Sequence, residues 1–424
     1  MEVIEIFKKI CSIPHCSKKS DKLKNFIEEF CEKNGCEVKS DKAGNIHCKK
    51  GEPAICLQAH YDMVCVGRAP DIEIVQKDGF LQAYESSLGA DNGMGVAMML
   101  LVAKRFDDVE LLFTADEEVG MIGASNLELQ VVSNRILNLD TEEEGKVYIG
   151  CAGGVDVEVK KRYDKSKLTD ESIYKLKIDG LPGGHSGVDI DKNIQNAIKE
   201  MGYYLVEFYP KIISIDGGEA LNSIPKSIEV IIAMNKDKTP PKSDMVKVEK
   251  LEKYEDRSFF IRSNEIVDMI CGFGNGVREY DKKMCLPSVS VNLAKIQTID
   301  DTISLQIFPR ANDDVSLEKI KKEIRSYFQN MGYSVEFSSQ YGAWKPEINE
   351  FSKEIYALYN EVFNEVSYSA IHAGLECGIL LQRLGKDKMI VSIGPNILYP
   401  HSVNEKCEIE SVKRIYNIVE KLMR

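Results

Sequence analysis

The chain has 424 residues, of which 43% are hydrophobic and 29% are charged, as is ordinary for a soluble globular protein of two or three domains. Its formal net charge of −12 at pH 7 gives it no electrostatic reason to bind nucleic acid or an anionic membrane surface. We expect a cytoplasmic protein, because no apolar run approaches the ~18–20 residues of a membrane span and the N-terminus lacks the order of a signal peptide.

The first 150 residues combine helix patterns with buried-strand patterns. Apolar residues recur every three or four positions in two stretches of the first 30 residues, which predicts two helices. Short apolar runs end just before His60, Asp116 and Asp140, and a helix pattern at 93–106 lies between the first two runs. This strand–helix–strand order predicts an α/β sheet whose strands are buried on both faces.

From about Val155 the strand patterns alternate apolar and polar residues, as half-buried antiparallel strands do. Helix patterns lie between them, including one rich in Lys and Glu at 245–254. Beyond Lys345–Pro346 the patterns of helices and fully buried strands return. We therefore predict one α/β domain in two pieces, 1–154 and 346–424, interrupted by an inserted α+β domain at 155–345.

Side chains that commonly bind metal ions follow four of the predicted buried strands. In an open α/β sheet, ligands bind beyond the carboxyl ends of the strands. His60 and Asp62 are two residues apart, so they point to the same side of an extended chain, and Asp62 can accept the second ring N–H of His60. The other strand-end candidates are Glu117, Glu118, Asp140 and His401.

Each candidate, taken alone, also has an ordinary structural explanation. Asp91 begins a predicted helix, where a carboxylate is favoured but where a plain N-cap is as common. Glu117 and Glu118 fit a solvated acidic turn, His401 fits a loop histidine, and the run 142–144 is expected to be solvated. Taken together, two histidines and at least three carboxylates at strand ends of one sheet predict a site for two divalent ions, about 3.5–4 Å apart.

The remaining histidines divide into two kinds. His185 lies in GGHSG, whose spacing excludes a Gly-x-Ser-x-Gly nucleophile elbow. A histidine flanked by glycines suits an electrophile better than a core position. His15, His47 and His372 have no adjacent carboxylate in the sequence, so we expect structural roles for them.

Cysteine spacing and a glycine-rich stretch exclude other kinds of site. None of the 12 cysteines forms a Cys-x-x-Cys pair, so we expect small buried hydrophobes rather than a disulfide framework or a cysteine-based zinc site. The stretch GFGNGV at 272–277 does not match the dinucleotide-binding fingerprint.

Several blocks of sequence run in order along nearly the whole chain: HYDMV, SLGADNGMG, DEEVGMIGA, LNLDTEEEG, GCAGG, GGHSG, NSIP, IHAGLECG and SIGP…PHS. Together they resemble the aminoacylhistidine dipeptidases. This family is also called the Xaa-His, cytosol non-specific or PepD-like beta-alanyl-histidine dipeptidases, and it belongs to the larger co-catalytic zinc peptidase group. The block IHAGLECG points to this branch in particular.

The resemblance implies a metal-dependent dipeptidase that hydrolyses unblocked dipeptides, of the Xaa-His type and more broadly. It implies two divalent ions, zinc in the first place and manganese or cobalt as alternatives. His60, Asp91 and Asp140 would hold one ion. Asp91, Glu118 and His401 would hold the other, so that Asp91 bridges the two.

The resemblance also implies roles for residues around the ions. Glu117 would be the general base for a water between the ions, and Asp62 would orient His60. His185 would stabilise the oxyanion, in its own subunit or in the partner's. Three residues would contact the substrate, Arg310 at its C-terminal carboxylate: Asn222, Arg310 and Gly374.

The family further implies a cis peptide at Asp91–Asn92 and a homodimer formed through the inserted domain, which would act as a lid. The chain is shorter than typical members, and the stretch between Asp62 and Asp91 is one of those trimmed. Two alternatives stay open. A related metal-dependent carboxypeptidase or N-acyl amino acid deacylase would use the same ligands, and an inactive binding relative would have lost ligands or the base.

Overall fold

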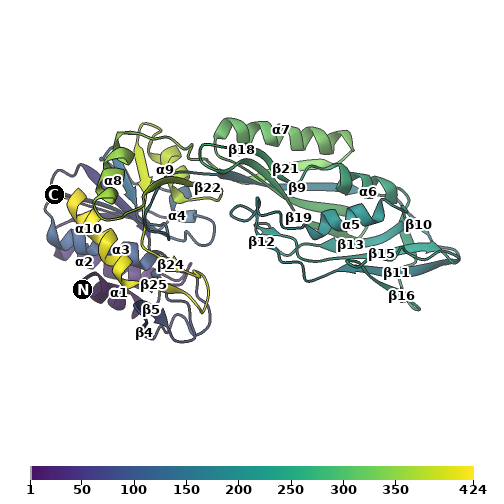
Figure 1. Cartoon of the computed structure of the whole chain (residues 1–424), viewed down its shortest axis with the longest axis horizontal. Helices are drawn as coiled ribbons and strands as arrows, with labels where there is room; N and C mark the ends of the chain where they lie inside the picture. The colour runs from purple at the N-terminus through teal and green to yellow at the C-terminus, as the bar shows by residue number, and fades with distance from the viewer. Residues whose placement is uncertain (1) are drawn as a thin grey trace. The chain divides into compact units, whose positions relative to one another are not determined.

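The computed structural model describes residues 2–424, which form two compact units (Figure 1). Unit 1 runs up to Cys151 and also takes in Trp344–Ala370 and Leu375–Arg424. Unit 2 comprises Ala152–Ala343 and the short segment Ile371–Gly374. Among the described residues, no helix is both long and apolar enough to cross a membrane.

The main sheet of unit 1 has eight strands in the order β1-β2-β6-β3-β7-β23-β8-β22. Their bounds are β1 (Glu37–Ser40), β2 (Ile46–Lys50), β3 (Ile55–His60), β6 (Val109–Thr114), β7 (Arg135–Asn138), β8 (Lys146–Cys151), β22 (Ser367–Ile371) and β23 (Met389–Ser392). The central strands β6, β3, β7 and β23 are parallel. Every residue of β3 and β6 is buried, as the continuous apolar runs predicted.

The register of the central strands brings their carboxyl ends to one edge of the sheet. His60 lies opposite Thr114, and Ser392 lies opposite Asn138. Residues that follow these strands are therefore neighbours in space although they are far apart in sequence. The small sheet β24-β25-β5-β4 belongs to the same unit: β4 (Ile74–Lys77), β5 (Phe80–Ala83), β24 (Ile397–Leu398) and β25 (Lys406–Glu408).

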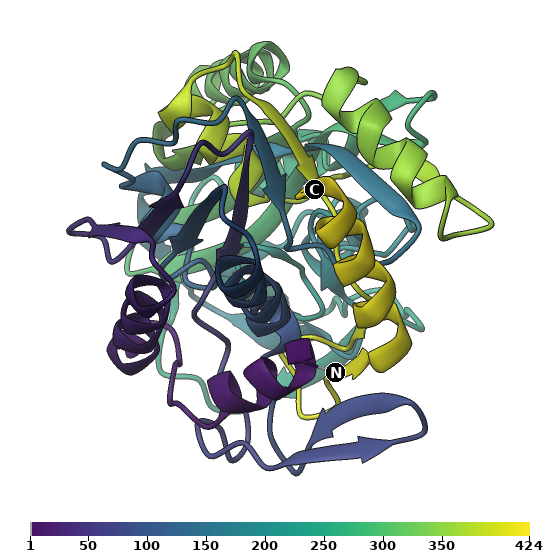
Figure 2. The ribbon, with the colours of Figure 1, turned by 90° about the vertical axis from the view of Figure 1, so that its left-hand side faces the viewer.

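Seven helices complete the described part of unit 1 (Figure 2): α1 (Glu2–Cys11), α2 (Asp21–Lys33), α3 (Ala90–Arg105), α4 (Ile122–Ser125), α8 (Glu350–Asn360), α9 (Glu376–Leu384) and α10 (Ile409–Leu422). Helix α3 is almost wholly buried because α1, α2 and α10 pack against it and it packs on β3 and β6. Gly93 allows the close approach of α1, since a Cβ there would lie 3.1 Å from the ring of Phe7. The apolar helix predicted at 93–106 is thus the central helix of the unit.

Two side-chain pairs in unit 1 differ from the expectations. Cys16 and Cys65 form a disulfide bond, whereas the lack of paired spacing predicted none. His47 has a carboxylate partner after all, because Nε2 lies 2.8 Å from Oε1 of Glu110 on the neighbouring strand β6. Neither pair is visible as a local motif, since each joins residues brought together only by the fold. Eight other cysteines are buried, as expected.

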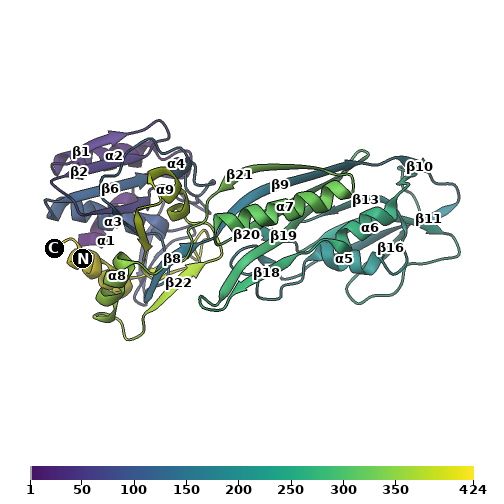
Figure 3. The same ribbon diagram turned by 90° about the horizontal axis from the view of Figure 1, so that it is seen from above.

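Unit 2 is built on an antiparallel sheet of nine strands in the order β16-β11-β15-β13-β19-β20-β9-β21, with β18 paired to β19 (Figure 3). The strands are β9 (Gly153–Arg162), β11 (Glu171–Ile178), β13 (Lys211–Gly217), β15 (Ile228–Asn235), β16 (Lys247–Leu251), β18 (Gly276–Asp281), β19 (Leu286–Ile299), β20 (Thr302–Ala311) and β21 (Ser334–Tyr341). Two short pairs lie beside it: β10 (Lys165–Lys167) with β17 (Ser258–Phe260), and β12 (Gly184–His185) with β14 (Ser223–Ile224).

Three helices pack on this sheet around one apolar core: α5 (Ala197–Leu205), α6 (Ser263–Gly272) and α7 (Asp314–Asn330). Helix α7 shows why the sequence folds this way. Its buried residues Leu317, Ile320, Ile324 and Phe328 recur at helical spacing, and the side chain of Asp313 caps its first turn by accepting from the backbone N–H of Ser316. The α+β character predicted for this section is therefore present.

The predicted Lys- and Glu-rich helix at 245–254 is wrong. The structure has the strand β16 there, paired with β11 at the edge of the sheet. Lys and Glu favour helices in isolation, but pairing with a neighbouring strand overrides that preference. Exposed charges on an edge strand also hinder further strand addition, so this composition suits the position.

Candidate metal centre

The edge of the unit 1 sheet brings the five predicted ligands together. His60 ends β3, Glu118 follows β6, Asp140 follows β7, Asp91 lies in the first turn of α3, and His401 lies between β24 and β25. Their ligand atoms form two groups in which all atoms lie within 4.8 Å of one another. The groups are His60 with Asp91 and Asp140, and Asp91 with Glu118 and His401.

Asp91 is common to both groups, and its two oxygens face different histidines. Oδ1 lies 3.3 Å from Nε2 of His60, and Oδ2 lies 3.1 Å from Nε2 of His401. On the first side, Oδ1 of Asp140 lies 3.2 Å from the same nitrogen of His60. On the second, Oε1 of Glu118 lies 2.9 Å from Nε2 of His401. A carboxylate divided in this way has the arrangement of a bridging ligand.

The donor set fits divalent ions in both kind and spacing. Imidazole nitrogen and carboxylate oxygen bind zinc at about 2.0–2.2 Å, so neighbouring ligands at tetrahedral angles lie roughly 3.3–3.5 Å apart. The four separations above, from 2.9 to 3.3 Å, are close to this value. The peptide bond Asp91–Asn92 is cis, as the resemblance implied, and Asn92 donates a side-chain hydrogen bond to Asp140.

The cluster contains more carboxylates than histidines, and the pKa values of several of its groups are shifted. Burial raises the pKa of Asp140 to about 6. Burial and the charges of Asp91 and Asp140 raise the pKa of Glu142 to about 8. Hydrogen bonds with Asp91 and Glu118 raise the pKa of His401 to about 11. A bound cation would oppose the crowding of negative charge, which is a further sign that the residues suit metal ions.

The expectation of a solvated run at 142–144 is wrong for two of its residues. Glu142 is half-buried and interacts with Asp91. Glu144 is also half-buried and forms a forked ion pair with Arg414, whose Nε and Nη2 lie 2.9 and 2.7 Å from its oxygens. The acidic run therefore faces the protein as well as solvent, which composition alone does not reveal.

Asp62 positions two parts of the centre, by its backbone and by its side chain. Nδ1 of His60 lies 3.0 Å from the backbone oxygen of Asp62 and 3.6 Å from its carboxylate, so the backbone oxygen, and not the carboxylate as expected, accepts the ring N–H and leaves Nε2 to face Asp91 and Asp140. The carboxylate accepts from the backbone N–H of Glu117 at 2.9 Å and from the hydroxyl of Ser17 at 2.7 Å. Burial raises the pKa of the Glu117 side chain well above its ordinary value.

A layer of buried polar side chains lies beneath the ligands, and the sequence patterns did not predict it. Glu376 Oε2 accepts from Nε2 of Gln58 and from the hydroxyl of Thr114, both at 2.6 Å. Gln58 in turn accepts from Nδ2 of Asn138 at 2.6 Å, and Asn138 accepts from the backbone N–H of Asp140. Gln58, Thr114 and Asn138 are visible in the sequence as polar residues near the carboxyl ends of mostly apolar strands, but the sequence does not show which residues they contact.

The other four predicted site residues all belong to unit 2. His185 lies on β12, where the backbone N–H of Ser186 donates to the backbone oxygen of Asn222 at 2.8 Å. Nδ1 of His185 accepts from the backbone N–H groups of Gly187 and Val188, at 3.2 and 3.1 Å. An accepting Nδ1 leaves the proton on Nε2. Burial and the charge of Arg310 lower the pKa of His185 to about 4, so the ring is a neutral donor at neutral pH.

Arg310 lies on β20 and is only 3% exposed. Its Nη1 donates to the hydroxyl of Tyr341 at 2.7 Å, and the guanidinium lies over the ring of Phe308. Its buried Nε has no hydrogen-bond partner among residues 2–424. A Cβ on Gly187 would lie 3.2 Å from this nitrogen and 3.1 Å from Cε1 of His185, so both side chains flank the same glycine. Gly374 ends the segment of unit 2 at 371–374.

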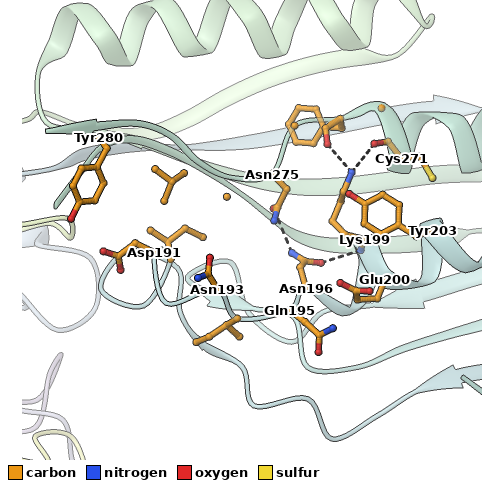
Figure 4. A pocket seen from close by; sticks show the side chains of 17 residues that line it. Asp191, Asn193, Gln195, Asn196, Lys199, Glu200, Tyr203, Cys271, Asn275 and Tyr280 are labelled. Carbon is orange, nitrogen blue, oxygen red and sulfur yellow. Dashed lines mark hydrogen bonds between the residues drawn. The ribbon is translucent and has the colours of Figure 1, made fainter. Parts of the chain in front are cut away.

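A separate hollow of about 760 Å³ lies in unit 2 beside α5 and the end of α6 (Figure 4). Lys199 is directed to three backbone oxygens there, those of Ile270, Cys271 and Phe273. Asn196 caps α5 and donates to the backbone oxygen of Leu293. These polar groups are satisfied within the protein, and the described lining includes none of the predicted site residues.

A match to the peptidase family M20/M25/M40 covers residues 56–424. The chain belongs to this family. Over 99% of its length the M20 peptidase is 30% identical to the cytosol non-specific dipeptidase of Escherichia coli (strain K12), of which the alignment covers 96%. The resemblance to this group of dipeptidases and the assignment to the metallopeptidases are therefore confirmed.

Solved structures confirm the fold class. An aminoacylhistidine dipeptidase from Vibrio alginolyticus superposes with a TM-score of 0.85 at 28% identity, over 100% of this chain and 96% of the other. A dinuclear metal-binding M20 peptidase from Bacillus subtilis shares the fold at 10% identity, with a TM-score of 0.50 over 99% and 96% of the two chains.

Proposed function

We propose that this M20 peptidase is a dipeptidase that hydrolyses unblocked dipeptides, Xaa-His dipeptides among them, with two divalent ions. The observation that carries the proposal is the divided carboxylate of Asp91, whose two oxygens face His60 and His401. The substrate class is supported by two similar proteins, a cytosol non-specific dipeptidase and an aminoacylhistidine dipeptidase. Zinc is the first choice of metal, with manganese or cobalt as alternatives.

Glu117 is the proposed general base. Two divalent ions, when bound, supply an activated water and polarise the scissile carbonyl. Glu117 takes the proton from the oxygen of the attacking water and delivers it to the nitrogen of the leaving amine. Burial raises the pKa of this carboxyl, so once it is ionised it accepts a proton more strongly than an exposed glutamate does. Asp62 fixes the backbone of this base.

Unit 2 supplies the proposed substrate contacts. Nε2–H of neutral His185 donates a hydrogen bond to the oxyanion, and Arg310 binds the C-terminal carboxylate of the dipeptide. Asn222 and the backbone of Gly374 complete the contacts. These roles require unit 2 to act as a lid and to bring His185 to the ions, in its own chain or in the partner subunit of a homodimer. We place the enzyme in the cytoplasm.

A substrate panel tests this function. The metal-free protein, and the protein reloaded with Zn²⁺, Mn²⁺ or Co²⁺, would be assayed with Ala-His, beta-Ala-His, Gly-Gly and Cys-Gly. A tripeptide and an N-acetyl amino acid serve as competing classes. We expect metal-dependent cleavage of dipeptides above both. Faster turnover of the tripeptide would favour an exopeptidase on longer chains, and faster turnover of the N-acetyl amino acid would favour a deacylase. No turnover by any loaded form would favour an inactive relative.

A further inference from the structure

Glu405 connects two segments that carry metal ligands. It lies four residues after His401, and its side chain is buried, with 2% exposure. Its carboxylate accepts hydrogen bonds from four consecutive backbone N–H groups, those of residues 88–91, at 2.8, 3.0, 2.8 and 3.4 Å. The last of these N–H groups belongs to Asp91. One buried side chain thus touches the backbone of the bridging ligand from the loop of another ligand.

The backbone at residues 88–91 is shaped to receive an anion. Gly89 has a φ of +70°, which turns successive N–H groups toward the same side at the start of α3. A side chain at this position would be strained, and its Cβ would lie 2.8 Å from Sδ of Met63. Such a turn at a helix N-terminus commonly binds an external anion. Here the anion is part of the protein and comes from the segment that follows His401.

His401 depends on this connection more than the other ligands do. Its side chain is 47% exposed and its φ is +56°, whereas the His60 side chain is 1% exposed. The backbone N–H of Glu405 also closes a turn with the oxygen of Ser402. The His401 ring contacts Asp91 and Glu118 through Nε2, and the loop that carries it is anchored to residues 88–91 through Glu405.

We propose that Glu405 is a positioning residue for one of the two metal sites, the one formed by Asp91, Glu118 and His401. Glu405 fixes the position of His401 relative to the carboxylate of Asp91, so that this site binds its ion tightly. The site of His60, Asp91 and Asp140 depends on it less, because two of its three residues, His60 and Asp140, lie at the ends of strands β3 and β7 of the main sheet. This inference rests on the proposed two-metal function.

The replacement Glu405→Gln tests the proposal at nearly constant volume. An amide has a single acceptor oxygen, and its NH₂ group would face backbone N–H donors. Glu405→Asp keeps the charge but shortens the side chain by one methylene, so it should give an intermediate effect. Glu410→Gln is the matched control, because Glu410 is a nearby glutamate in the first turn of α10 whose exposed side chain pairs with Lys413.

The metal-free proteins would be titrated with Co²⁺ and followed by calorimetry and by visible absorption of the bound ion. We expect two ions in the parent and in Glu410→Gln. In Glu405→Gln we expect one ion at parental affinity and a second bound at least about tenfold more weakly, with an altered cobalt spectrum. Glu405→Asp should lie between them, and it also serves if the Gln variant does not fold.

Two results would overturn the proposal: parental affinity for both ions in the two Glu405 variants, or equal weakening of both ions. Thermal unfolding of the metal-free proteins shows whether equal weakening comes from a general loss of stability. The parent titration reports separately on the proposed function. A parent that binds a single ion would contradict the two-metal centre itself, whatever the Glu405 variants do.

Discussion

The carboxylate of Asp62 accepts a hydrogen bond from the backbone N–H of Glu117 at 2.9 Å. Asp62 therefore contacts the proposed base through its side chain, whereas its backbone oxygen accepts from the ring of the proposed ligand His60. Asp62→Asn replaces one of the two acceptor oxygens with an NH₂ group, which cannot accept from the backbone N–H groups of Glu117 and Glu118. We expect kcat to fall about 10–100-fold, as is usual for residues that orient a metal centre, while two ions remain bound. Steady-state kinetics with metal analysis would measure both; loss of metal with unchanged kcat per bound ion would contradict this role.

Glu117 and His60 should separate catalysis from metal binding. Glu117→Ala should retain both ions and lose about 10²–10⁴ in kcat, because it removes the proton carrier and leaves the five ligands in place. His60→Ala should lose metal as well as activity, since Nε2 lies near both Asp91 and Asp140. Metal content and kcat of the two purified variants would be compared. Near-normal turnover by Glu117→Ala would show that another group is the base.

Arg310 should distinguish substrates by their carboxylate. Lysine cannot reproduce the guanidinium fork or its stacking over Phe308, so Arg310→Lys should raise KM for a dipeptide by about tenfold or more. For the same dipeptide with an amidated C-terminus, the substitution should raise KM much less. Arg162→Lys is the control, because Arg162 is an exposed residue paired with Asp301. An equal rise in KM for the free and the amidated dipeptide would show that Arg310 does not bind the substrate carboxylate.

His185 should remain neutral across the working range of pH. Burial and the charge of Arg310 lower its pKa to about 4 from 6.5. As the pH falls, the unfolded chain therefore binds a proton at this histidine at a higher pH than the folded chain does. The free energy of unfolding should fall as the pH drops from about 6.5 to about 4. Histidine NMR should show an Nε2–H tautomer that does not titrate between pH 8 and pH 5. A ring that protonates near pH 6.5 would contradict the environment described.

Metal should stabilise the protein more at pH 8 than at pH 5. Folding raises the pKa of Asp140 to about 6 and that of Glu142 to about 8. Between pH 5 and pH 8 the folded metal-free protein therefore binds more protons than the unfolded chain. Its free energy of unfolding should fall as the pH rises through this range. The raised pKa of His401, to about 11, acts in the same direction. Bound cations oppose the repulsion and bind best to deprotonated ligands. Thermal unfolding with and without Zn²⁺ at the two pH values would test this, and a smaller metal-induced shift at pH 8 would contradict it.

Much of the centre could be predicted because its ligands follow strands that the sequence marks plainly. A mostly apolar run that ends at His60 or Asp140 predicts a buried strand and a candidate ligand at its end. Parallel strands bring their carboxyl ends to the same edge of the sheet. Gln58, Glu376 and Glu405 could not be placed in this way, because their partners lie on other segments and no local pattern records the pairing. The strand β16 was missed for the opposite reason: its local preference for helix is strong, and the neighbouring strand β11 overrides it.

The chain order of unit 1 has a consequence for how the enzyme is made. Strand β23 pairs with β7, and His401 follows β23, yet all of Ala152–Ala343 lies between β7 and these residues in the chain. The ribosome therefore synthesises Ala152–Ala343 of unit 2 after four of the proposed ligands and before the fifth, His401. Because domains generally fold in order of synthesis, the nascent protein should pass through a state with a folded unit 2 and an incomplete metal centre. Capture of the second ion is then a late event of biosynthesis.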